Sequence, residues 1–214
     1  MMAWPYTVLD DGQHFGLGRE QLELREFSGV EHAEGEIVGR TLDGQLFDYG
    51  QQPLASDKES RYGWYLDLVD AGEEVVQPAS LLGNLLVVST RTDGGGSNFC
   101  EANSSGWLIA VDVQTGLPSY DSGNSSYVPI FDLNGDSSFD DGDLIGIVNE
   151  AGPEVGNILV SIKLSGEPSG LASIGNHVFV ATGASGSDPG TVTPFELNVQ
   201  TSATSGRVSW YQLR

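Results

Sequence analysis

The sequence predicts an all-β domain. Short runs of alternating or β-branched apolar residues recur along the chain, and clusters of Gly, Asn, Asp and Ser separate them, as is typical of antiparallel strands joined by turns. No helical pattern extends over ten residues or more. The chain has 214 residues, 29 of them Gly. This length suits one domain, and the glycine content suits a turn-rich one.

The N-terminal quarter carries the weaker strand signals. Residues 1–18 resemble a lead-in segment, so we place the domain at residues 19–214. Arg19–Phe27 fits a strand or one short helix, and Glu31–Tyr49 alternates in places, as expected of an edge strand and its neighbour. Gln51–Arg61 is polar and is expected to be a loop.

Strand signals sharpen further along the chain. Gly63–Leu68 is rich in aromatic residues, Glu73–Val76 begins another strand, and Gly106–Asp112 forms a third that ends in a Thr-Gly turn. Leu81–Thr90 has the pattern of a hairpin with Gly-Asn at its turn. A helical turn is expected at Leu144–Val148.

The hairpin pattern of Leu81–Thr90 recurs at Ser173–Thr182. Aligning the two segments matches their turn Gly and Asn residues and a Val and a Thr of the second strand. A second internal similarity relates Gly106–Ile109 to Gly206–Trp210. Recurring hairpins indicate blade-like antiparallel sheets, and therefore a partial or modified β-propeller.

The charge of the chain limits its partners. Acidic residues outnumber basic residues 30 to 9, which gives a net charge of −21. Such a charge argues against binding to nucleic acid or to anionic membranes and favours cations. No apolar run is long enough to insert into a membrane. Met1–Tyr6 does not resemble a signal peptide, so we expect any export signal to lie upstream of this sequence.

The most informative stretch is an acidic loop at residues 132–143. If Asp132 is position 1, oxygen donors fall at positions 1, 3, 5, 7, 9 and 12, which is the ligand spacing of an EF-hand-type calcium loop. The candidate ligands are Asp132, Asn134, Asp136, Ser138 through its carbonyl, Asp140 and Asp143. Ca²⁺ takes six to eight oxygens, and without a cation the four carboxylates would repel one another.

Two residues depart from the EF-hand pattern. Position 6 is Ser137 instead of Gly, so a left-handed backbone there would be strained. Position 12 is Asp143 instead of a bidentate Glu. The alternative is an acidic surface turn, because Asp, Asn, Gly and Ser are common in turns. Mg²⁺ fits less well than Ca²⁺, since it keeps more of its own waters.

The sequence evidence for other functional sites is weaker. His14, His32 and His177 lack zinc-site spacing, and no Gly-x-Ser-x-Gly motif is present. Cys100 is the sole cysteine, which excludes an intrachain disulfide, and we expect a structural role for it. Glu73 and Glu74 are adjacent on a strand and should face opposite sides, so they do not form a catalytic pair. We therefore expect no enzymatic activity.

Four runs, in this order, resemble one protein family. They are Tyr62–Val76 (with GWYLDL and GEEVV), Val87–Gly116 (with VVST, FC and GWL), Phe131–Leu144 (the acidic loop) and Gly206–Arg214 (GRVSWYQLR). The chain resembles the C-terminal domain of the PilY/PilC proteins, which are associated with the tip of type IV pili. The family propeller is much longer, so this chain would represent only its C-terminal blades.

The resemblance implies a modified β-propeller with one calcium site in the acidic loop. It also implies a non-enzymatic adhesin or biogenesis factor at the bacterial surface or pilus tip. Calcium occupancy would tune pilus extension and retraction, twitching motility and adhesion, and the partners would be minor pilins and host-surface receptors. The alternative is a secreted enzyme or carbohydrate-binding module with a structural, dockerin-like calcium loop.

Overall fold

The regular structure of the described residues is almost entirely β-structure. The computed structural model describes residues 2–6, 22–32, 37–46, 63–92, 105–146, 153–183, 190–200 and 207–211. Within these ranges the regular structure consists of fifteen β-strands and two 3₁₀ turns, with no α-helix. The all-β prediction is therefore confirmed. None of these ranges contains a helix with the length and apolarity needed to cross a membrane.

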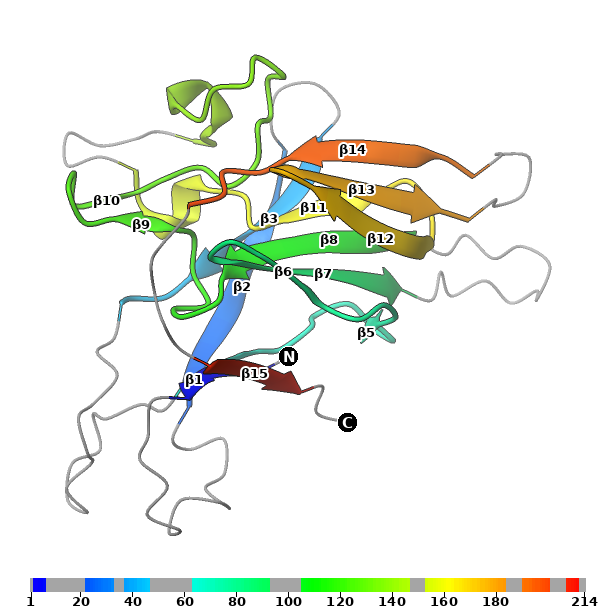
Figure 1. The fold of residues 1–214 in the computed structure, drawn as a ribbon, viewed down its shortest axis with the longest axis horizontal. Helices are drawn as coiled ribbons and strands as arrows, with labels where there is room; N and C mark the ends of the chain where they lie inside the picture. The colour runs from blue at the N-terminus through cyan, green and yellow to red at the C-terminus, as the bar shows by residue number, and fades with distance from the viewer. Residues whose placement is uncertain are drawn as a thin grey trace, which may run out of the picture.

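Ten strands form one curled sheet (Figure 1). They are β1 (Met2–Tyr6), β2 (Glu23–His32), β3 (Val38–Asp43), β4 (Trp64–Leu66), β5 (Glu74–Val75), β6 (Ser80–Leu82), β7 (Leu85–Thr92), β8 (Ser105–Asp112), β11 (Ser161–Leu164) and β15 (Arg207–Tyr211). Their order is β15-β1-β4-β2-β3-β11-β8-β7-β5, and β6 also pairs with β7. Since β1 pairs with both β15 and β4, the two ends of the chain meet within this sheet.

A second, three-stranded sheet carries β12 (Pro168–Ile174), β13 (His177–Thr182) and β14 (Val192–Glu196). It lies beside β7 and β8, and β12 contacts both strands (Figure 1). A short hairpin of β9 (Tyr120–Asp121) and β10 (Ser126–Tyr127) precedes the acidic loop. The 3₁₀ turns are η2 (Asp141–Asp143) and η3 (Val155–Asn157).

Both predicted hairpins are present. β6 and β7 join through a turn in which Gly83 has φ +57°, and β12 and β13 join through a turn in which Gly175 has φ +63°. Glycine tolerates this left-handed conformation, which explains the shared Gly-Asn signature of the two segments. The first hairpin belongs to the large sheet and the second to the three-stranded sheet.

Of the two alternatives for Arg19–Phe27, the strand is present over residues 23–27. Two other local expectations need correction. β3 is an interior strand and not an edge strand, because β11, more than a hundred residues later, pairs along its other side. The helical turn lies at Asp141–Asp143, just before the expected segment, and residues 147–148 fall outside the described part of the chain.

The core lies around β7 and β8. Both strands are buried along almost their whole length, on both faces. This explains their continuous apolar runs, since a strand covered on both sides does not alternate. Trp64 is completely buried and donates its indole N–H to the carbonyl of Val113 at 3.1 Å. The turn after β8 passes so close to this ring that a Cβ on Gly116 would lie 2.3 Å from Trp64 Cδ2.

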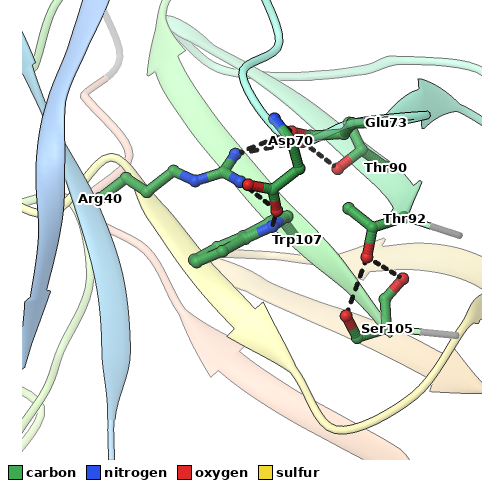
Figure 2. A network of polar contacts seen from close by, with 7 residues as sticks. All are labelled: Arg40, Asp70, Glu73, Thr90, Thr92, Ser105 and Trp107. Carbon is green, nitrogen blue, oxygen red and sulfur yellow. Dashed lines mark hydrogen bonds and ion pairs between the residues drawn. The ribbon is translucent and has the colours of Figure 1, made fainter. Parts of the chain in front are cut away.

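A buried arginine ties β3 to the segment before β5 (Figure 2). Arg40 is fully buried, and its Nη1 donates to both carboxylate oxygens of Glu73 at 3.1 Å. Its Nη2 forms an ion pair with Asp70 at 2.6 Å. The guanidinium carbon lies 3.7 Å from the ring centre of Trp107, whose indole N–H donates to Asp70 at 2.9 Å. Thr90 completes the cluster with a 2.7 Å bond to Glu73.

Candidate metal centre

The acidic loop is anchored at both ends by buried apolar residues. Phe131, just before it, pairs with Leu197 in an isolated β-bridge, and both side chains are buried. At its far end Ile145 is buried and donates its N–H to the carbonyl of Asn157 at 2.9 Å. Between these anchors the loop projects away from the sheets, as the yellow-green segment with its small 3₁₀ turn in Figure 1. The loop is therefore a surface feature on a fixed base.

Side-chain oxygens organise the backbone of this loop. Four of the predicted ligands accept main-chain N–H groups from residues two to five positions ahead, and these bonds fold the loop into successive turns. The pairs are Asp132 Oδ1 with Gly135 at 2.7 Å, Asp132 Oδ2 with Ser137 at 2.9 Å, Asn134 with Asp136 at 2.9 Å, Asp136 with Ser138 at 2.8 Å and Asp140 with Gly142 at 2.8 Å.

The chain reverses at two left-handed residues. Gly135 has φ +75° and Ser137 has φ +63°. A left-handed backbone at Ser137 is the conformation expected of position 6, which an EF-hand loop reserves for Gly. For a residue with a Cβ this conformation costs about 1–2 kcal/mol, so neighbouring contacts must compensate for it.

Asp143 differs from the other predicted ligands because it is buried. Only 1% of its surface is exposed, whereas Asn134, Asp136, Ser138 and Asp140 are exposed. Its carboxylate accepts main-chain N–H groups across the loop, from Leu133 at 2.6 Å, Asn134 at 3.4 Å and Asp140 at 3.1 Å. These bonds close the loop on itself.

Burial also changes the protonation equilibrium of Asp143. Desolvation of the carboxyl group raises its pKa, and the negative charge of Asp132 acts in the same direction. The three N–H bonds oppose this shift without cancelling it. The environment of Asp143 therefore disfavours a bare negative charge on this carboxylate.

Positions 3, 5 and 9 of the loop lie close together. The Asn134 amide donates to Asp136 Oδ2 at 3.2 Å. A Cβ on Gly142 would lie 2.6 Å from Asn134 Nδ2 and 3.2 Å from Asp140 Oδ1, so the side chains of positions 3 and 9 both pack over this glycine. In the part of the chain that the structure describes, no group of three or more His, Cys, Asp or Glu side chains is arranged to hold a metal ion.

The donor set nevertheless fits a hard cation. It consists of carboxylate, amide and main-chain carbonyl oxygens, which are the ligands that Ca²⁺ takes in proteins. A carboxylate has about four lone-pair sites, so Asp132, Asp136 and Asp140 can retain an N–H bond while presenting oxygen to an ion. The buried carboxylate of Asp143 would be a further ligand, and the Ser138 carbonyl and the Asn134 amide oxygen would complete the set.

One residue at this site lay beyond sequence reasoning. Glu196, the last residue of β14, accepts a hydrogen bond from Ser137 Oγ at 3.1 Å. Its carbonyl also accepts the N–H of Asp132 at 3.2 Å. Nothing in the local sequence marks this glutamate, because it is 59 residues from Ser137 along the chain.

The remaining predicted features are dispersed. His177 is partly exposed and lies 3.6 Å from Glu196. His14, Cys100 and the side chain of His32 lie outside the described part of the chain. The side chain of Glu73 is fully buried, whereas 49% of the neighbouring Glu74 side chain is exposed. The prediction that these two acids face opposite sides is confirmed.

Comparisons of the chain with protein-family models, with curated proteins and with solved structures found no match. The geometry of the loop and the sequence motifs are therefore the observations that bear on the function of this chain.

Proposed function

We propose that this chain is a non-enzymatic, calcium-binding β-domain and that the loop from Asp132 to Asp143 is its calcium site. The observation that supports this most strongly is the agreement between ligand spacing and backbone shape. The residue at position 6 is left-handed although it is a serine. Ser125, in the turn between β9 and β10, is left-handed as well (φ +54°), so the conformation of Ser137 supports a calcium loop only in combination with the spacing of the oxygen donors.

We propose further that the domain belongs to a PilY/PilC-type surface protein at the tip of type IV pili. The ordered sequence motifs support this assignment. In this setting the curled sheet would be part of a modified propeller, and calcium would set the shape of a loop that faces minor pilins or host receptors. Calcium occupancy would then influence pilus extension and retraction, twitching motility and adhesion.

Binding to purified minor pilins tests the pilus assignment. Immobilised minor pilins should retain the chain in the presence of Ca²⁺ and release it in a chelator. Asp136→Asn should weaken the calcium-dependent retention, whereas Asp141→Asn, which removes the same charge from a loop position that is not a ligand, should not. Equal retention with and without Ca²⁺ would contradict the regulatory role, and reproducible turnover of glycan or ester substrates would contradict the non-enzymatic one.

A further inference from the structure

The acidic loop is linked to the three-stranded sheet through one carboxylate. Ser137 Oγ donates to Glu196 Oε2 at 3.1 Å, and the N–H of Asp132 donates to the main-chain carbonyl of Glu196 at 3.2 Å. Glu196 therefore holds the loop at positions 1 and 6, which flank its first turn. The Glu196 side chain is 19% exposed, whereas Ser137 is exposed, so this hydrogen bond lies at the surface.

The same carboxylate also holds the turn of the β12–β13 hairpin. Glu196 Oε1 accepts the side-chain amide of Asn176 at 2.7 Å, and His177 Nε2 lies 3.6 Å from Oε2. The main chain repeats this connection, since Leu197 donates its N–H to the carbonyl of Asn176 at 2.8 Å. Two turns that are far apart in sequence thus share one carboxylate, with Asn176 on Oε1 and both Ser137 and His177 on Oε2.

From this arrangement we infer that Glu196 is a positioning residue that couples calcium binding in the loop to the order of the β12–β13 turn, with Ser137 as the relay. The inference rests on the proposed calcium site. Asp136 and Ser138, the ligands at positions 5 and 7, flank Ser137 on both sides. An ion that holds both of them also fixes the direction in which the Ser137 hydroxyl points.

The coupling follows from the charges around Glu196. Without a cation, the carboxylates of Asp132 and Asp136 lie in the same loop as the Ser137 hydroxyl and repel one another, which loosens the turn that presents this hydroxyl. With the cation bound, the Ser137 hydroxyl stays hydrogen-bonded to Glu196, and Glu196 stays hydrogen-bonded to Asn176. Calcium therefore favours the state in which the loop and the β12–β13 turn are joined.

This role also explains why position 6 is a serine. Glycine would adopt the left-handed conformation at lower cost, but it has no hydroxyl to reach Glu196. Ser137→Gly therefore separates the two properties of this residue, because it relieves the backbone strain and removes the relay.

Amide hydrogen exchange of the full chain, with and without Ca²⁺, tests the inference. In the wild-type chain, Ca²⁺ should slow exchange at least tenfold in peptides covering residues 132–143 and in peptides covering residues 174–178. Ser137→Gly should bind Ca²⁺ at least as tightly, as measured by calorimetry, and should retain the protection of the loop. In this variant, the Ca²⁺-dependent slowing of exchange in residues 174–178 should be lost. Glu196→Gln should reduce that protection, and Ser125→Gly, which makes the same substitution at the left-handed serine of the β9–β10 turn, should behave as wild type.

The outcomes separate the two claims. A wild-type chain that does not bind Ca²⁺ would overturn the proposed function and this inference together. Binding with protection confined to residues 132–143 would overturn the coupling and leave the calcium site standing. Undiminished protection of residues 174–178 in Ser137→Gly would show that the serine is not the relay.

Discussion

Removing the buried carboxylate of Glu73 should destabilise the domain severely. This side chain is fully buried. Its carboxylate accepts two hydrogen bonds from Arg40, one from Thr90 and one from the N–H of Asp70. Glu73→Ala leaves the buried guanidinium of Arg40 with Asp70, whose side chain is 42% exposed. Breaking a buried ion pair by removing one partner costs about 3–5 kcal/mol. For a domain of this size, that corresponds to a fall in Tm of about 6–20 °C.

The neighbouring Glu74 provides a matched control. It pairs with Arg91 on the surface, and the Glu74 and Arg91 side chains are 49% and 34% exposed. An exposed pair of this kind contributes about 0–1 kcal/mol, so Glu74→Ala should change the free energy of unfolding by no more than that. Both variants remove one negative charge and one glutamate, at adjacent positions. They differ in the burial of the carboxylate and in the bonds that it accepts.

Denaturant unfolding in the presence of a chelator, followed by tryptophan fluorescence, measures both effects. Trp107 lies against Arg40 and should report the loss of the cluster (Figure 2). The double variant Arg40→Met, Glu73→Leu should recover at least half of the lost stability, because a buried ion pair can often be replaced by apolar side chains. Equal losses in Glu73→Ala and Glu74→Ala would refute the reasoning, since the burial of Arg40 and Glu73 would then carry no energetic weight.

Three further predictions concern the turns and the loop. Gly116→Ala should cost about 2 kcal/mol or more in unfolding experiments, because φ is +68° and the new Cβ would collide with Trp64. Burial raises the pKa of Tyr127, so the folded chain keeps this proton after the unfolded chain has lost it, and stability should fall as pH rises above about 10. In a series of unfolding curves from pH 8.5 to 11, Tyr127→Phe should show a shallower fall. Asp140→Asn should weaken Ca²⁺ binding by about tenfold or more, or about 1.4 kcal/mol, whereas Asp141→Asn should leave the Kd within about twofold; equal effects would argue for general electrostatics instead of ligation.

The features that the sequence predicts well are local ones. The Gly-Asn hairpins, the left-handed position of Ser137 and the opposite faces of Glu73 and Glu74 all follow from backbone geometry over a few residues. The calcium site at residues 132–143 stays a prediction, although the spacing of its donors is likewise defined within twelve positions.

Features that depend on distant contacts could not be predicted in the same way. Arg40 is buried because Glu73, 33 residues later, reaches it, whereas an isolated arginine in a strand is expected on the surface. The interior place of β3 depends on β11, and the role of Glu196 depends on a loop 59 residues away. Single-sequence patterns record which side of a strand a residue faces but not which strand comes to lie beside it.

Calcium titration by calorimetry on the metal-stripped chain, with Asp136→Ala alongside, tests the central claim most directly. We expect one site in the wild-type chain with a Kd of about 10⁻⁵ M or lower, and binding in the variant that is weaker by about tenfold or more. Absence of binding heat, together with no thermal stabilisation by Ca²⁺, would contradict the proposed calcium site and show that residues 132–143 form an acidic surface turn.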